Sequence, residues 1–165
     1  MVSVQLGIEG FGFDRIQSVG PMAFADCANL LSVIVGPDVM EIDSTTFLND
    51  AGKLERISVD LESMSYASKL SDEISVYGSN VLFDLNARSI VLGCANSILS
   101  SDPANKANGT GAKDGHVKVA SIGDYAFYGV DRFNYPPSTN AWYLGSQISA
   151  VGKYAFAGVK GLDLT

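Results

Sequence analysis

The sequence predicts a mainly β fold in which short strands and tight helical turns repeat and stack as a solenoid. Three observations support this: a six-residue pattern recurs four times in 165 residues, aliphatic residues alternate after it, and 17 glycines mark many turns. Apolar residues make up 47% of the chain and charged residues 18%, which is not typical of disorder. The length favours one domain.

The repeated pattern is a β-branched aliphatic residue, usually glycine, two variable residues, alanine or threonine, and phenylalanine. Its copies are residues 19–24 (VGPMAF), 42–47 (IDSTTF), 122–127 (IGDYAF) and 151–156 (VGKYAF). The first two copies start 23 residues apart and the last two 29 residues apart. Alanine and phenylalanine among small residues suit a tight helical or 3₁₀ turn. Stacking such units buries apolar residues that one unit cannot bury alone.

Alternating aliphatic residues predict the strands. The start of the chain alternates over residues 2–6, and the segments after the first two hexapeptides do so over 30–35 and 54–59. A further strand is expected at 74–77. We therefore expect one domain over 1–165, with repeat units near 16–38, 39–60, 119–137 and 148–165 and an irregular insert at 61–118. The repeated phenylalanines are expected to point inward at equivalent positions: Phe24, Phe47, Phe127 and Phe156.

These residues resemble the BspA-like leucine-rich repeat family, whose units read approximately I-G-x-x-A-F-x-G-C-x-x-L-x-x-I-x-I-P. Residues 19–35 follow that pattern closely, residues 122–130 match its first half, and residues 80–97 are similar to a hairpin-like insert ending in Leu-Gly-Cys-x-Asn-Ser. The resemblance implies a right-handed leucine-rich-repeat solenoid in a bacterial or protist surface protein that binds other proteins or host matrix. It implies no catalytic machinery and no cofactor.

Net charge and hydropathy disfavour some classes of binding partner. The net charge of −7 disfavours a nucleic-acid backbone or an anionic membrane surface, because both reward clustered Lys and Arg. The longest apolar stretches, such as residues 30–35, are far shorter than the ~18 residues of a membrane span. The start of the chain has no secretory leader. We expect an extracellular or cell-surface location from the resemblance, with a cytoplasmic one left open.

Residues suited to catalysis or metal binding lack the partners that such chemistry needs. His116 is the one histidine, so no histidine cluster can form, and no G-x-S-x-G or phosphate-binding loop occurs. The neighbouring carboxylates Asp72 and Glu73, and Glu41 with Asp43, suit a solvated face better than an acid–base pair. The sequence therefore predicts no enzyme, no metal and no cofactor.

The two cysteines do not form a disulfide framework. Cys27 stands three residues after its phenylalanine, where Val130 and Val159 stand in other units, so we expect a small buried apolar position there. Cys94 is expected to be buried as well. Asn108 begins an N-x-T sequon, which matters only in a eukaryotic secretory pathway.

Stacking would repeat the outward strand residues into one continuous face. The candidate ligand contacts on that face are Ser32, Ile34, Glu55, Arg56 and Ser58. Three aromatics of an insertion, Tyr135, Trp142 and Tyr143, either anchor a partner or cover an irregular turn. The expected function is non-catalytic binding or adhesion to a protein or glycoconjugate, with a structural spacer as the alternative. End-to-end self-association is a further expectation, because stacked units leave open edges.

The sequence makes one spectroscopic prediction. Far-ultraviolet circular dichroism of the purified chain should show mostly strand and turn with little helix, because the aliphatic alternation has a period of two. A spectrum dominated by helix would contradict the strand assignments.

Overall fold

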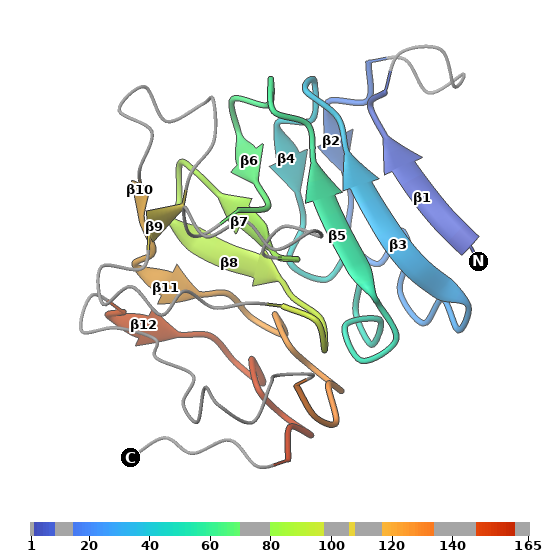
Figure 1. Ribbon diagram of the computed structural model, residues 1–165, viewed down its shortest axis with the longest axis vertical. Coiled ribbons are helices and arrows are strands. Elements are labelled where there is room, and N and C mark those ends of the chain that lie inside the picture. Colours follow the sequence, from blue (N-terminus) through green and yellow to red (C-terminus); the bar gives the residue numbers. More distant parts are fainter. Residues whose placement is uncertain are drawn as a thin grey trace.

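A computed structural model describes residues 2–8, 15–69, 80–97, 106–107, 117–133 and 148–160 (Figure 1). Within these ranges the regular elements are short strands joined by turns. The strands are β1 (Val2–Leu6), β2 (Ser18–Val19), β3 (Leu30–Val35), β4 (Glu41–Ile42), β5 (Arg56–Val59), β6 (Tyr66–Ala67), β7 (Leu82–Asp84), β8 (Ser89–Leu92), β9 (Lys106–Ala107), β10 (Val117–Lys118), β11 (Ser121–Ile122) and β12 (Ala150–Val151).

The described strands form four sheets. β1, β3 and β5 pair in parallel and lie side by side in Figure 1, and β2 pairs in parallel with β4. The largest sheet has the order β12-β11-β8-β7-β6; β12, β11 and β8 are parallel, whereas β8, β7 and β6 form an antiparallel meander. β9 and β10 form a separate antiparallel pair.

The parallel pairs bring together residues at the same position of the six-residue pattern. Val19 of β2 pairs with Ile42 of β4, and Ile122 of β11 pairs with Val151 of β12. β8 enters the same arrangement, since its Ile90 pairs with Ile122. The expected irregular insert at 61–118 therefore contains a strand that pairs in register with the pattern, although it carries no copy of it.

Phe24 and Phe127 each lie in a turn whose backbone N–H groups alternate between two kinds of acceptor. The N–H of Phe24 donates to the carbonyl of Thr46 at 2.9 Å, and that of Asp26 to the carbonyl of Leu48 at 2.9 Å. The N–H of Ala25, between them, bonds within its own turn. Every second N–H is thus engaged by the next turn and is not available for an i→i−4 bond, so no α-helix forms.

The turn of Phe127 repeats this alternation. Tyr125 and Phe127 donate their backbone N–H groups to the carbonyls of Lys153 and Ala155, at 2.9 and 2.8 Å. Two residues after each phenylalanine the backbone is left-handed, and those residues are Asp26, Asn49, Gly129 and Gly158, with φ of 58°, 68°, 78° and 90°. Aspartate, asparagine and glycine tolerate this conformation best. It ends the turns at Asp26, Gly129 and Gly158, whereas the turn of Phe47 continues to Lys53.

The predicted right-handed leucine-rich-repeat solenoid with short helical turns is wrong. The described strands divide among four small sheets, two of these contain antiparallel pairs, and the described ranges contain no helix. One physical reason is the engagement of alternate turn N–H groups by the neighbouring turn. The other is that side chains, and not further strands, bond to the outer edges of β4 and β5.

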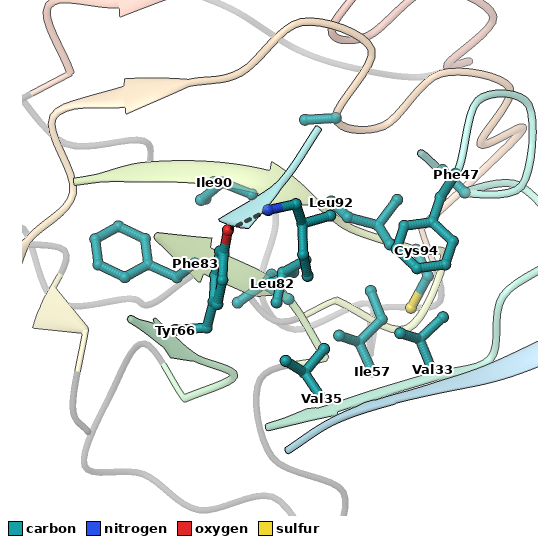
Figure 2. Close-up of a cluster of buried hydrophobic side chains, with 14 of the residues drawn as sticks. Val33, Val35, Phe47, Ile57, Tyr66, Leu82, Phe83, Ile90, Leu92 and Cys94 are labelled. Atoms are coloured by element: carbon teal, nitrogen blue, oxygen red, sulfur yellow. Dashed lines mark hydrogen bonds between the residues drawn. The ribbon is translucent and has the colours of Figure 1, made fainter. Parts of the chain in front are cut away.

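At β4 the side chain that closes the edge is Tyr66. Its hydroxyl accepts the backbone N–H of Ile42 at 2.7 Å (Figure 2). Tyr66 is buried, and burial together with the carboxylate of Asp84 raises the pKa of its hydroxyl to about 12. The neutral hydroxyl therefore takes the place that a strand carbonyl would otherwise fill.

At β5 the closing group is the buried amide of Asn80. Its Oδ1 accepts the N–H of Ile57 at 3.2 Å, and its Nδ2 donates to the carbonyl of Asn96 at 3.3 Å. Asn96 in turn donates from its Nδ2 to the carbonyl of Glu55 at 2.9 Å. Ser68 adds a bond from the N–H at the end of β5 to its hydroxyl. Two asparagines thus tie the parallel strands to the segment that follows the meander.

One apolar core lies between the parallel strands and the meander. Val33 and Ile57 from β3 and β5 lie on the side of Leu82 from β7 (Figure 2), and these three side chains and Phe83 of β7 are fully buried. Full burial of such side chains stabilises the fold by about 1.5–3 kcal/mol each. This core is continuous with the repeated phenylalanines of both ends.

The repeated phenylalanines stack in pairs along the turns. The rings of Phe24 and Phe47 are 5.5 Å apart at an interplanar angle of 11°, and those of Phe127 and Phe156 are 5.2 Å apart at 4°. Phe47 and Phe127 are buried, whereas Phe24 and Phe156 are partly exposed. The four positions are therefore equivalent in conformation but not in burial.

This difference in burial makes Phe127→Ala and Phe24→Ala an informative pair. Phe127→Ala should lower the free energy of unfolding by about 3–5 kcal/mol, because it removes a fully buried ring. Phe24→Ala should cost less, since part of that ring already contacts water. Urea denaturation followed by circular dichroism measures both, and equal costs would contradict the burial difference.

Candidate binding surface

Alternate residues of β1, β3 and β5 point away from the core and form two rows across the sheet. Because β3 sends Val33 and Val35 into the core, its intervening residues face outward. The strand register defines the rows as Ser3–Ser32–Arg56 and Gln5–Ile34–Ser58. We call these six residues the outer face.

The outer face is accessible on both edge strands, since Ser3 of β1 is exposed as Arg56 of β5 is. Arg56 and the preceding Glu55 are exposed, and Ile34 and Ser58 are partly exposed. Ser32 was expected to contact a ligand, but only 5% of it is exposed, so it offers a ligand little surface. A short side chain on the central strand, with neighbours on both sides, is covered where a longer one would protrude.

Arg56 is held in place at the edge of this face. Its Nε donates to the hydroxyl of Ser58 at 3.1 Å, and the backbone N–H of Glu55 donates to the carbonyl of Leu31 at 2.9 Å. A guanidinium group carries five N–H donors, of which this side-chain bond uses one. The surface therefore presents an oriented cation, and the residue before it in the chain, Glu55, is an exposed acid.

Other residues that the sequence singled out lie outside the described ranges. These are Tyr135, Trp142, Tyr143, His116, Asn108, Asp72, Glu73, and the strand expected at 74–77. Their roles stay predictions.

The carboxylate of Asp43 has a structural role. Its Oδ1 accepts both the backbone N–H and the hydroxyl of Thr45, at 2.8 and 2.6 Å. These hydrogen bonds lower the pKa of Asp43, so it stays ionised as part of a turn. Glu41 is exposed on β4. Asp43 is thus engaged within its turn, and the expectation for the pair stays a prediction.

Both cysteines are free thiols. Cys94 is fully buried, and burial raises the pKa of its thiol. Cys27, which was expected to be buried, is only partly so, although it packs against the core. A buried neutral thiol is unreactive, so Cys94 acts as a compact apolar side chain.

Asp50 is a buried acid that the sequence analysis missed. It is fully buried, and neither carboxylate oxygen accepts a well-formed hydrogen bond from the described residues. Burial raises its pKa to about 6, against the opposing effects of Lys53 and the backbone N–H of Cys27. A signal was available: Asp50 stands three residues after Phe47, at the position of Cys27 and of valines in the other units. The repeat thus places a carboxylate where an apolar residue belongs.

Two further findings concern metals and membranes. In the described part of the chain, no three His, Cys, Asp or Glu side chains are grouped so that they could hold a metal ion. The same residues contain no helix of the length and hydropathy that crossing a membrane requires.

Asp50 predicts a pH-dependent stability. Its pKa is raised from 3.8 to about 6 on folding, so its proton stabilises the folded chain at low pH. This stabilisation is lost as the pH rises through about 6. Asp50→Asn should therefore become steadily more stable relative to the parent between pH 4 and 7, by at most about 1.4 kcal/mol per pH unit. Thermal melts across that range test this, with exposed Asp38→Asn as the control that should leave the pH profile unchanged.

The chain was compared with protein-family models, curated proteins and solved structures. No family model, curated protein or solved structure matches it. The resemblance to BspA-like repeats therefore rests on the residues quoted for it, and the inference of function rests on the geometry of the surface.

Proposed function

We propose that this chain is a non-catalytic binding or adhesion module of a surface or secreted protein, and that its ligand contacts the outer face. The observation that carries the proposal is the in-register pairing of three parallel strands, which lines up outward side chains into one continuous surface. A rigid sheet presents such a surface without an ordering cost upon binding. A protein or a glycoconjugate is the class of ligand we propose.

Arg56 is the residue that we expect to contribute most to the binding energy. Arginine is enriched among residues that dominate binding energy, because its planar donors match carboxylate or other oxygen acceptors. Its bond to Ser58 orients the guanidinium before any ligand arrives. Glu55 adds an exposed acceptor next to it. A partner with paired acidic and donor groups would complement both side chains.

A structural spacer is the second candidate. Serines occupy three of the six positions of the outer face, and one of them is buried. Small polar side chains of this kind suit a surface that separates other modules without contacting a ligand. Binding measurements distinguish the two proposals, because a spacer has no ligand on this face.

Arg56→Glu is the decisive variant. The full chain is tested for binding to a panel of purified matrix proteins, cell-surface proteins and glycans by surface plasmon resonance. For a ligand that the parent binds, Arg56→Glu should raise the dissociation constant at least about tenfold. Arg132→Glu, the same change at an exposed arginine outside the sheet, should bind as the parent does.

Two outcomes oppose the adhesion proposal. If no member of the panel binds, the spacer proposal is favoured. If both variants bind as the parent does, the ligand site lies away from the outer face. Thermal melts of both variants check that each one is folded.

A further inference from the structure

The aliphatic position of the repeated pattern is buried in three of its four copies. Val19, Ile42 and Ile122 are 8%, 7% and 1% exposed, whereas Val151 of β12 is 54% exposed. The three buried residues and Val151 occupy the same place in paired strands. β12 therefore presents an apolar strand residue on a surface where the other copies are covered.

The glycine that follows this aliphatic residue also differs among the copies, but here the exception is the first copy and not the last. A Cβ on Gly152 would overlap the backbone of Asp124, and one on Gly123 would lie 3.0 Å from the carbonyl oxygen of Ile90. Both glycines are thus packed against the preceding strand. At Gly20 a Cβ would meet no atom of the described residues within 4 Å. Among those residues, the place that a preceding strand fills beside Gly123 and Gly152 is open beside Gly20.

A repeated hydrogen bond joins these two positions inside the molecule. The N–H of Gly152 donates to the carbonyl of Ile122 at 2.8 Å, and the N–H of Gly123 to the carbonyl of Ile90 at 2.8 Å. By the same relation, the equivalent donor of β2 is Gly20, and the equivalent acceptor of β12 is Val151. Figure 1 shows β2 and β12 far apart, toward opposite sides of the molecule.

The exposed side chains of the two adjoining turns are also complementary. Tyr154 is 62% exposed and Met22 is 58% exposed. Within the molecule, the ring of Tyr154 stacks on that of Tyr125, which occupies the same position of the pattern as Met22, with centroids 5.6 Å apart. A methionine thioether packs favourably on an aromatic ring. Met22 of another copy would thus meet Tyr154 as Tyr154 meets Tyr125.

From these observations we infer that copies of this chain associate head to tail, with β12 of one copy pairing in parallel with β2 of the next. In this interface the N–H of Gly20 donates to the carbonyl of Val151, and Met22 packs on Tyr154. The contact joins two different surfaces, so each copy can bind one neighbour at each end. Association then continues into linear oligomers instead of stopping at a symmetric dimer.

Two variants each block one of the two surfaces. Gly20→Val adds a side chain where a single copy has open space, so its fold and melting temperature should match the parent. In an interface that repeats the β11–β12 contact, where a Cβ on Gly152 would overlap the backbone of Asp124, the same side chain would meet the backbone after β12 of the neighbour. Val151→Asp places a carboxylate on the exposed strand residue of the other surface. Met64→Asp is the matched control, because Met64 is 58% exposed in a loop after β5.

Analytical ultracentrifugation of the full chain from micromolar to millimolar concentration provides the test. The weight-average mass of the parent and of Met64→Asp should rise steadily with concentration, while each blocking variant alone should stay monomeric. Mixing Gly20→Val with Val151→Asp should restore a one-to-one dimer and nothing larger, since each supplies the surface that the other lacks.

A symmetric interface cannot give that mixing result. The inference is overturned if the parent stays monomeric throughout, if Met64→Asp blocks association as strongly as the two variants, or if their mixture forms no dimer. If Gly20→Val fails to fold, loss of association in Val151→Asp still tests the β12 surface. Association of Val151→Asp as strong as that of the parent would then refute it.

Discussion

Backbone hydrogen bonds between neighbouring turns are the constraint on which the rest of this structure depends. The turns of Phe24 and Phe127 donate alternate N–H groups to carbonyls of the next turn, as Phe24 does to Thr46 and Phe127 to Ala155. This spacing brings the phenylalanine rings into stacking distance. It also packs the backbones so closely that Gly152 has no room for a side chain. Turn conformation, ring stacking and glycine placement are consequences of one bonding pattern.

Parallel strand pairing ends at β4 and β5, where side chains and not a further strand accept the backbone N–H groups. The hydroxyl of Tyr66 and the amide of Asn80 accept N–H groups at the edges of β4 and β5. A buried N–H without an acceptor destabilises the folded chain. Because these two side chains supply the acceptors, no further strand is needed at these edges to avoid that cost. The meander can then run antiparallel, and β8 starts a second parallel stack with β11 and β12.

The fold therefore separates two kinds of surface. Side chains that alternate outward along β1, β3 and β5 form the outer face, with Arg56 on its β5 edge, whereas the strand edges of β2 and β12 lie at the ends. A ligand on the outer face and a second copy at an end would not compete for the same residues. Head-to-tail oligomers would present Arg56 many times along one assembly, which raises avidity for a multivalent ligand.

The sequence by itself determined the spacing of the repeats and the identity of the residues that pair, such as Val19 with Ile42 and Ile122 with Val151. These depend on side-chain type and chain distance, which the sequence shows. Only the tertiary structure decided the turn conformation, the division into small sheets, the burial of Ser32 and the isolation of Asp50. Each of these depends on a neighbour more than 20 residues away, such as Tyr66 for Ile42 or Asn80 for Ile57, and local pattern does not specify which distant group a backbone donor will meet.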